Sequence, residues 1–470
     1  MNLPAWKQTT IACTLGPATD APGILEEMLA AGMDVARVNT SHGSLAEHAR
    51  RIGNMRTQAR RMGVPLSILV DLPGPKFRLG ELPGGARELA RGSRVTLAVT
   101  PNDPNILPFP HRRLLSTLRV DQPVYLSDGS VRLRVEGIAA GRAYCEVAAG
   151  GTVRSGSGVN LPESRFSALV PTSEDRRNIA FAASQEVEWI GVSFVESARD
   201  MMRVRKLLPP GASPLLIAKI ERRRAVKQLG PILNASDGVM VARGDLGVET
   251  DLAEIPLLQK RIIAMANARA RPVITATQML ESMAEQERPT RAEVTDIANA
   301  VLDGTDGVML SAETAIGRFP ALAVDTMRRV VTATELEYGG RIALAGLLDN
   351  DSGAPQDPMA SAACQLAARL GAKAIVARVS GAEAAFAIAR FRPSAPLLVV
   401  AESERLVRCL AAVRGVAPLL VQPAAGNDAA LTLAREWLRA RQLARPGDTL
   451  VVLASDAGLV PSGALHVTHV

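Results

Sequence analysis

Charged and hydroxyl-bearing residues follow a series of short apolar runs along the chain. The carboxylates of Glu221 and Asp245 are hard oxygen ligands of the kind that suits Mg²⁺. Arg37 and Lys219 offer fixed positive charge to a phosphoryl group. Phosphoryl transfer depends mainly on positioning and charge neutralisation, so these residue types predict that chemistry. The complete set is Arg37, Asn39, Asp71, Lys219, Glu221, Arg243, Asp245, Thr277 and Glu313.

The segment GVMVARGDLGVE places glycines beside Asp245. Because glycine has no Cβ, backbone N–H groups in this segment can approach an anionic carboxylate closely. The chain has no G-x-x-x-x-G-K-[ST] segment, which argues against a P-loop nucleotide site. A carboxylate-bearing substrate is therefore easier to predict here than a nucleotide.

The apolar runs predict the elements that must position these residues. Each run is rich in Val and Ile and precedes a longer segment with helical spacing, as in βα units around a parallel sheet. Eight strands close a (β/α)8 barrel, whose C-terminal face would carry all the polar residues. The eight runs are residues 9–15, 34–39, 66–72, 188–194, 214–220, 238–243, 272–277 and 307–312.

Two further segments lie outside the eight predicted βα units. Residues 73–159 contain short alternating apolar stretches with Gly or Pro punctuation, which predicts an inserted β-barrel domain. Because it leaves the predicted C-terminal face, we expect it to act as a lid. Residues 341–470 again alternate strands and helices. We expect a TIM-barrel catalytic domain over 1–72 and 160–340, an inserted all-β domain after the third strand, and a C-terminal α/β domain for regulation or oligomerisation.

The bulk composition argues against several classes of protein. Of 470 residues, 47% are hydrophobic and 21% are charged, which is typical of a multidomain globular protein. No signal-peptide pattern or apolar stretch of about 18 residues occurs, so we expect no membrane association. The net charge of +7 is spread along the chain and aromatics make up 3%, which does not favour nucleic acid. Four widely separated cysteines predict neither disulfides nor zinc and favour the reducing cytoplasm.

At these residues the chain resembles pyruvate kinase. The resemblance spans essentially the whole chain, strongly in the barrel and weakly in the other two parts. It implies transfer of a phosphoryl group from phosphoenolpyruvate to ADP, giving pyruvate and ATP in the final step of glycolysis. It also implies Mg²⁺ or Mn²⁺ as cofactor and a homotetramer. The matching strings are TTIACTLGPAT, ARVNTSHG, GVNLP, AKIE, DGVMVARGDLGVE, TATQMLESM and the segment from Arg288 to Pro320.

The resemblance implies roles for the catalytic residues. Arg37 and Lys219 bind the transferring phosphoryl group, and Lys219 stabilises the charge that develops as the enolate leaves. Glu221 and Asp245 are the divalent metal ligands.

The resemblance also implies how the substrates are held. Backbone groups of Gly244 and Asp245, together with Thr277, hold the substrate carboxylate, and Thr277 relays the enolate proton. A structural role in the turn remains open for His42. The residues that match nucleotide contacts are Asn39, His42 and Arg78.

The monovalent-cation pocket of the family matches Asn39, Ser41, Asp71 and the carbonyl of Leu72. Potassium-dependent members usually carry Glu at the position of Lys76, whereas members with Lys there resemble a group that works without potassium. An ammonium group can replace the ion electrostatically. We therefore expect K⁺ not to be required, with Lys76 near Asp71, although a surface lysine is the alternative.

Other positions also depart from the family pattern. Pro73 stands for the usual Lys, Thr40 for Phe and Arg222 for Asn, changes that concern domain closure or nucleotide contacts. In the C-terminal part, residues 378–383 match the effector loop of sugar-bisphosphate-regulated relatives. Glu383 in this stretch would repel a phosphate, so we expect no activation by fructose 1,6-bisphosphate through it.

Two other functions fit part of the pattern. Another metal-dependent barrel acting on phosphoenolpyruvate or pyruvate, such as an aldolase, would need the same metal and carboxylate groups. The inserted domain and Arg78 argue against it. A catalytically silent relative that binds nucleic acid is the second alternative. The residues that argue against it are Lys219, Glu221, Asp245 and Thr277.

Overall fold

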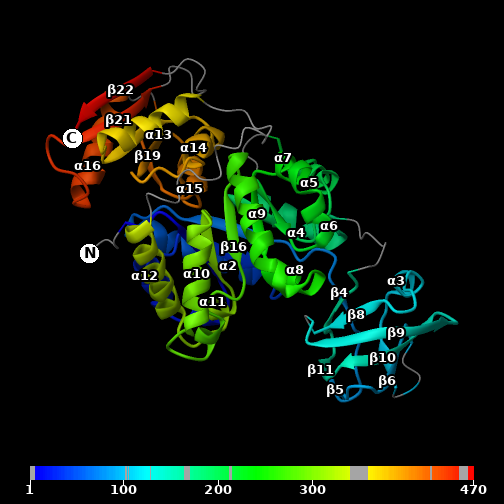
Figure 1. Cartoon of the computed structure of the whole chain (residues 1–470). Helices are drawn as coiled ribbons and strands as arrows, with labels where there is room; N and C mark the ends of the chain where they lie inside the picture. Colours follow the sequence, from blue (N-terminus) through cyan, green and yellow to red (C-terminus); the bar gives the residue numbers. More distant parts are fainter. Residues whose placement is uncertain are drawn as a thin grey trace.

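The computed structural model has a barrel in the middle, with the inserted sheets at one end and the C-terminal part at the other (Figure 1). It describes residues 6–100, 103, 105–127, 129–162, 170–210, 214–338, 358–423, 426–454 and 464–470. Residues 339–357, around the predicted start of the C-terminal domain, lie outside these ranges.

The eight apolar runs form a closed parallel barrel, which confirms the predicted fold class. Its strands are buried along almost every residue because side chains on both faces are covered, so they read as continuous apolar runs. Strand β3 pairs with β13 across the insertion, and Asp71 lies opposite Gly191. The strands are β1 (Thr10–Thr14), β2 (Val35–Asn39), β3 (Ser67–Asp71), β13 (Trp189–Val192), β14 (Leu215–Ile220), β15 (Gly238–Ala242), β16 (Val273–Ala276) and β17 (Gly307–Leu310).

Helices surround the barrel, and several begin with a reciprocal capping box. Ser44 with Glu47 and Thr290 with Glu293 each satisfy backbone donors at a helix start. In the described part of the chain, none of the helices combines the length and apolarity needed to span a bilayer. The helices are α1 (Ile24–Ala31), α2 (Leu45–Met62), α4 (Ser173–Ser184), α5 (Ala198–Arg205), α6 (Arg223–Lys227), α7 (Leu229–Ala235), α8 (Arg243–Glu249), α9 (Ile255–Ala268), α10 (Arg291–Leu302), α11 (Ala312–Ala315) and α12 (Pro320–Tyr338).

In its described strands the inserted segment forms a seven-stranded and a two-stranded sheet, as expected for an all-β domain. Its edges approach each other, since the amide of Gly80 donates to the carbonyl of Pro108 at 2.8 Å. They form no ladder, because β4 has two residues and Pro108 at the end of β7 lacks an N–H. The elements are β4 (Phe77–Arg78), β5 (Ala86–Leu89), β6 (Arg94–Ala98), β7 (Ile106–Pro108), α3 (Arg112–Leu115), β8 (Pro123–Leu126), β9 (Val131–Ala139), β10 (Arg142–Ala149), β11 (Gly151–Arg154) and β12 (Gly158–Asn160).

The C-terminal part is an α/β unit around a five-stranded sheet in the order β20-β19-β18-β21-β22. Its strands are parallel except β22, which pairs antiparallel with β21. The elements are α13 (Pro358–Leu370), β18 (Ala374–Arg378), α14 (Ala382–Ala389), β19 (Leu397–Ala401), α15 (Glu404–Leu410), β20 (Val416–Leu420), α16 (Asn427–Ala440), β21 (Thr449–Ala454) and β22 (Ala464–His469).

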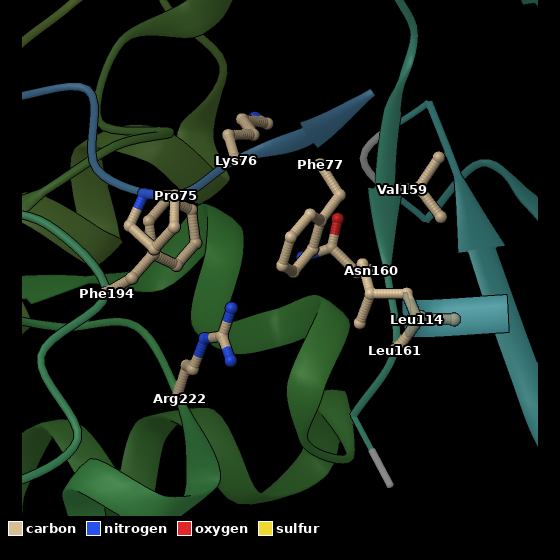
Figure 2. A pocket seen from close by; sticks show the side chains of 9 residues that line it. All are labelled: Pro75, Lys76, Phe77, Leu114, Val159, Asn160, Leu161, Phe194 and Arg222. Atoms are coloured by element: carbon tan, nitrogen blue, oxygen red, sulfur yellow. The ribbon is translucent and has the colours of Figure 1, made fainter. Parts of the chain in front are cut away.

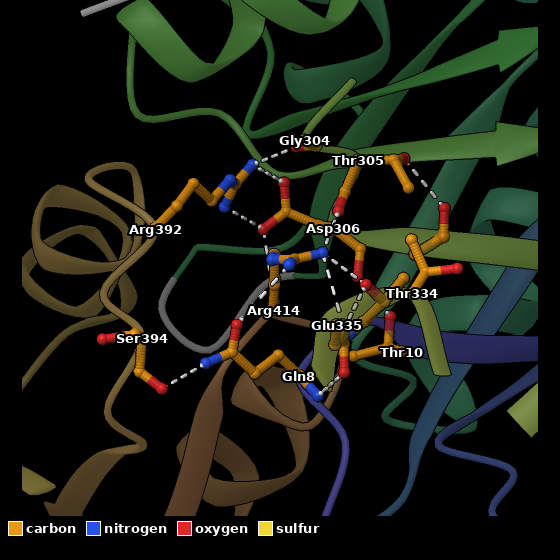
Figure 3. A network of polar contacts seen from close by, with 12 residues as sticks. Gln8, Thr10, Gly304, Thr305, Asp306, Thr334, Glu335, Arg392, Ser394 and Arg414 are labelled. Atoms are coloured by element: carbon orange, nitrogen blue, oxygen red, sulfur yellow. Dashed lines mark hydrogen bonds and ion pairs between the residues drawn. The ribbon is translucent and has the colours of Figure 1, made fainter. Parts of the chain in front are cut away.

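The C-terminal part joins the N-terminal end of the barrel through buried polar contacts (Figure 3). Arg392 donates to both carboxylate oxygens of Asp306, at 2.8 and 2.6 Å, and to the carbonyl of Gly304 at 2.9 Å. Trp189 of β13 stacks on Phe386 of α14, with ring centroids 6.1 Å apart. The barrel is therefore closed at this end, and its opposite face is the one that carries the polar residues.

Candidate active site

Arg37, Asp71 and Lys219 meet at the C-terminal face of the barrel. Arg37 donates from Nε and Nη2 to Asp71 Oδ2 at 2.9 and 2.6 Å, and from Nη1 to Thr14 Oγ1 at 2.9 Å. A Cβ on Gly191 would lie 3.1 Å from Asp71 Oδ1, so glycine gives this carboxylate room. Burial raises the pKa of Asp71, but Lys219 and Arg37 outweigh that effect and lower it. Asp71 is therefore ionised and holds two cations in place.

Three acceptors surround the ammonium group of Lys219. Nζ donates to Ser193 Oγ at 2.7 Å and lies 3.1 Å from Asp71 Oδ1 and 2.9 Å from Glu221 Oε1. Burial lowers the pKa of Lys219, but Asp71 and Glu221 outweigh it and raise the pKa above its ordinary value. The side chain thus carries a buried, charged ammonium group at the C-terminal face of the barrel.

Glu221 follows β14 and is held at both carboxylate oxygens. Oε1 faces Lys219, and Oε2 accepts the amide of Phe194 at 2.7 Å. Burial raises the pKa of Glu221, and although Lys219 lowers it, Asp245 raises it further. A divalent cation between Glu221 and Asp245 would relieve this repulsion, so the two carboxylates fit such an ion.

The described residues contain no group of three or more His, Cys, Asp or Glu side chains arranged to hold a metal. Mg²⁺ typically binds one or two carboxylates and completes its shell with water and substrate oxygens. Two carboxylates are therefore sufficient for a shared site of that kind.

Thr277 and Gly244 form a second part of the site, beyond β15 and β16. The amide of Gly244 donates to Thr277 Oγ1 at 2.9 Å, and Thr277 Oγ1 donates to the carbonyl of Ala276 at 2.6 Å. Thr277 has φ +70° and Gln278 has φ +55°, which is unfavourable for residues with a side chain. Arg243 donates to the carbonyl of Thr277 at 2.5 Å and to Asp296 at 2.7 Å. The arginine thus holds the strained turn.

The predicted monovalent-cation pocket has internal partners for several of its groups. Ser193 Oγ donates to the carbonyl of Leu72 at 2.7 Å, and Asn39 Oδ1 accepts the amide of Ser41 at 3.1 Å. The ammonium of Lys76 lies 3.7 Å from Asp245 Oδ1, so its ion pair is with a predicted metal ligand. The sequence predicts Lys76 near Asp71, and the structure places its ammonium group at Asp245.

The residues predicted to contact the nucleotide lie on separate elements. Asn39 ends β2, and His42 is exposed in the turn that follows. Arg78 lies on β4 and donates to the carbonyl of Gly156 at 2.9 Å, within the inserted segment. Glu313 accepts the amides of Leu280 and Ser311 at 3.1 and 2.6 Å, so its carboxylate supports loops.

Several site residues are missing from the sequence-based set. Ser193 and Phe194 directly follow β13, where the predicted site residues also follow their strands. They are absent from the predicted set because that set consists mainly of charged residues. Glu249 ends α8, away from any strand end. Burial raises the pKa of Glu249 to about 7; Arg222 opposes this shift, while Glu196 and Asp245 add to it.

Comparison with known proteins assigns the family. The model of the pyruvate kinase barrel domain matches residues 6–324, and that of the pyruvate kinase alpha/beta domain matches residues 357–464. The chain is 38% identical to a pyruvate kinase of Agrobacterium vitis, over 95% of this chain and 93% of that protein. It is 37% identical to a pyruvate kinase of Methylorubrum extorquens, over 98% of this chain and 96% of that protein. It is 39% identical to a pyruvate kinase of Thermococcus litoralis, over 89% of each chain. The chain therefore belongs to the pyruvate kinase family.

Proposed function

We propose that Lys219 and Arg37 act on the phosphoryl group that this enzyme moves from phosphoenolpyruvate to ADP. Membership of the family makes the chain a transferase for these two substrates. The observation that best supports the role of Lys219 is its buried, charged ammonium group between Asp71 and Glu221. A phosphoryl group can take over N–H donors that now point at carboxylates, because its oxygens are equally strong acceptors.

The reaction breaks the bond between phosphorus and the enol oxygen, while an oxygen of the ADP β-phosphate forms the new bond to phosphorus. Lys219 stabilises the negative charge left on the enolate oxygen. Carbon 3 of the enolate then takes a proton, and we assign its delivery to the hydroxyl of Thr277. The amide of Gly244 donates to this hydroxyl, which orients it. Backbone groups of Gly244 and Asp245 hold the substrate carboxylate in this proposal.

Members of the family generally use a divalent metal, and we propose Mg²⁺ at Glu221 and Asp245. When bound, the ion neutralises charge on the substrate oxygens. The chain's own contribution is to keep Glu221 oriented through Lys219 and Phe194. Mn²⁺, which takes the same oxygen ligands, serves as the alternative ion.

We assign nucleotide contacts to Asn39, His42 and Arg78. Arg78 lies on the inserted segment, and Asn39 lies on the barrel, so a nucleotide that touches both requires the two parts to approach. Residues 73–159 are therefore proposed as a lid domain on a barrel of residues 1–72 and 160–340. Residues 341–470 complete the proposed division as a C-terminal domain.

We propose that turnover does not require K⁺. The support is that Arg37 and Lys219 already neutralise Asp71, and that Lys76 adds an ammonium group at Asp245. Initial rates in potassium chloride and in tetramethylammonium chloride should agree. A many-fold stimulation by potassium would contradict the proposal, and the Lys76→Glu variant should acquire such a dependence.

A homotetramer in the cytoplasm is the proposed state of the enzyme. Large apolar side chains on or beside the barrel helices α9 and α11 remain exposed in the single chain, which supports burial against another copy. They include Leu252, Leu257 and Ile316, exposed by 74%, 68% and 68%. Light scattering on the purified protein would measure the mass, and a monomer would contradict the tetramer.

The assay that tests the function is release of pyruvate from phosphoenolpyruvate in the presence of Mg²⁺, with and without ADP. The proposal requires both the metal and ADP. Release without ADP would indicate a phosphatase, which transfers the phosphoryl group to water, instead. No release under either condition would indicate a catalytically silent relative.

A further inference from the structure

A small pocket that is open to solvent lies where the inserted segment joins the barrel. Phe77 of β4 and Asn160 of β12 line it from the inserted side, and Phe194 and Arg222 line it from the barrel side. Figure 2 shows the guanidinium of Arg222 pointing into the pocket between the phenylalanine rings. The described ends of both connections between the inserted segment and the barrel therefore border this space.

Phe194 has a backbone conformation that phenylalanine rarely adopts. Its φ is +55°, a region in which bulky residues are genuine outliers. Such a conformation persists only where the surroundings fix it, and outliers of this kind concentrate at functional sites. The ring lies against Gly74, where a Cβ would come within 2.8 Å of Phe194 Cδ2. Gly74 is itself anchored, because its amide donates to Asp175 Oδ1 at 3.0 Å.

The strained backbone of Phe194 points its amide at the proposed metal site. This amide donates to Glu221 Oε2 at 2.7 Å, while Lys219 lies 2.9 Å from the other oxygen of the same carboxylate. A hydrogen bond of this kind fixes the orientation of a carboxylate, and groups behind metal ligands commonly set metal affinity in this way.

Arg222 is the second contact of the Phe194 ring. Its guanidinium carbon lies 5.2 Å from the ring centroid, which is within the range of a cation–π contact. Arg222 Nη1 is fixed by Glu196 Oε1 at 2.8 Å. Arg224 also pairs with Glu196, at 3.2 Å, but its side chain is 64% exposed and is not among the residues that line the pocket. The chain thus contains two arginines that share one carboxylate, of which Arg222 stacks on Phe194.

We propose that Phe194 is a positioning residue for the divalent metal, and that Arg222 clamps it. Gly74 and Arg222 hold the ring, the ring holds the strained backbone, and the backbone amide holds Glu221 in the orientation that binds the ion. The proposal rests on the metal role of Glu221 given above. It deepens that function by adding two residues that act through Glu221 without touching the substrate.

The test measures the binding of Mn²⁺ to the full chain in the absence of substrate and nucleotide. The electron paramagnetic resonance signal of the free ion gives the amount of Mn²⁺ that is not bound. Arg222→Met should weaken Mn²⁺ binding about threefold to tenfold, and Phe194→Leu about tenfold or more. Arg224→Met is the matched control, because it also removes a partner of Glu196, and it should leave the dissociation constant unchanged. Phe194→Tyr keeps the ring and should restore wild-type binding. Thermal unfolding in EDTA reports whether each variant is folded.

Equal dissociation constants for Arg222→Met and Arg224→Met would overturn the proposal, and this comparison decides the matter even if Phe194→Leu does not fold. A wild-type protein that binds no Mn²⁺ would overturn it as well. The assay contains neither phosphoenolpyruvate nor ADP, so it is independent of turnover. A chain that binds Mn²⁺ with the expected differences but releases no pyruvate would contradict the proposed function alone.

Discussion

At the scale of single residues, the site combines charges that would each be costly alone. Burial disfavours the charged form of Lys219, Asp71 and Glu221. Lys219 and Asp71 compensate each other, whereas the pKa of Glu221 stays raised despite Lys219. Lys219 is paired at every N–H, so its charge is kept without a bound substrate. Electrostatic groups that are already oriented need no reorganisation when charge develops in the transition state. The geometry therefore favours stabilisation of an enolate over proton transfer by this lysine.

Glu249 gives a prediction on pH. Its pKa is about 7 in the folded chain, chiefly because of burial, and about 4.3 in an unfolded chain. The folded state therefore holds the proton more tightly, and stability falls as the pH rises from about 4.3 to about 7. Glu249→Gln should remove this loss, so the variant should be more stable than wild type at pH 8. Urea unfolding in EDTA at several pH values measures the difference, and parallel stability profiles would contradict the assignment.

At the scale of elements, the turns after the strands carry the geometry of the site. Thr277 and Gln278 both have positive φ, and Arg243 holds this turn through the carbonyls of Ala276 and Thr277. Gln259 and Asp296, on α9 and α10, fix Arg243 in turn. Two helices outside the barrel thereby determine where the Thr277 hydroxyl lies.

Arg243→Lys tests this arrangement. A lysine has one ammonium group in place of the planar fork and cannot bridge the same carbonyls and Asp296. A shift of the turn by about 1 Å can cost up to about a hundredfold in rate. We expect kcat for pyruvate formation to fall markedly while the chain stays folded by circular dichroism. An unchanged kcat would show that the turn keeps its position without the arginine.

The elements also show how far the sequence is informative. Every predicted barrel strand is present in the structure. These strands could be recognised in the sequence because parallel strands that are covered on both faces are apolar along almost their whole length. The convergence of Arg37, Asp71 and Lys219 follows from that topology alone. Closure of the inserted sheet into a barrel stays a prediction, because it depends on contacts between the two short edge strands β4 and β7. The partner of Lys76 and the strain at Phe194 depend on side-chain packing and backbone dihedrals, which no periodicity encodes.

At the scale of the whole molecule, the closed end of the barrel is a packing surface for the C-terminal part. Barrel-interior side chains such as Trp189 and Met240 share one apolar cluster with Phe386 and Val413. The Arg392–Asp306 ion pair lies within this seam, with side chains 4% and 2% exposed. The charges of the candidate site and the charges of this seam thus lie at opposite ends of the barrel.

Arg392→Met should destabilise the chain strongly. It leaves Asp306 buried without its principal cation, and breaking a buried pair in this way costs about 3–5 kcal/mol. Arg378→Met removes an ion pair with Glu402 at the surface and should cost less than about 1 kcal/mol. Urea unfolding compares the two variants, and similar losses would show that the seam does not depend on this pair.

The most direct measurement is the rate of pyruvate formation from phosphoenolpyruvate, ADP and Mg²⁺ by the Lys219→Met variant. Lys206→Met, which changes an exposed lysine after α5, is the control. If Lys219 stabilises the enolate, kcat should fall by at least about 10²- to 10³-fold in Lys219→Met and remain at the wild-type value in Lys206→Met. A folded Lys219→Met protein with near wild-type kcat would contradict the account.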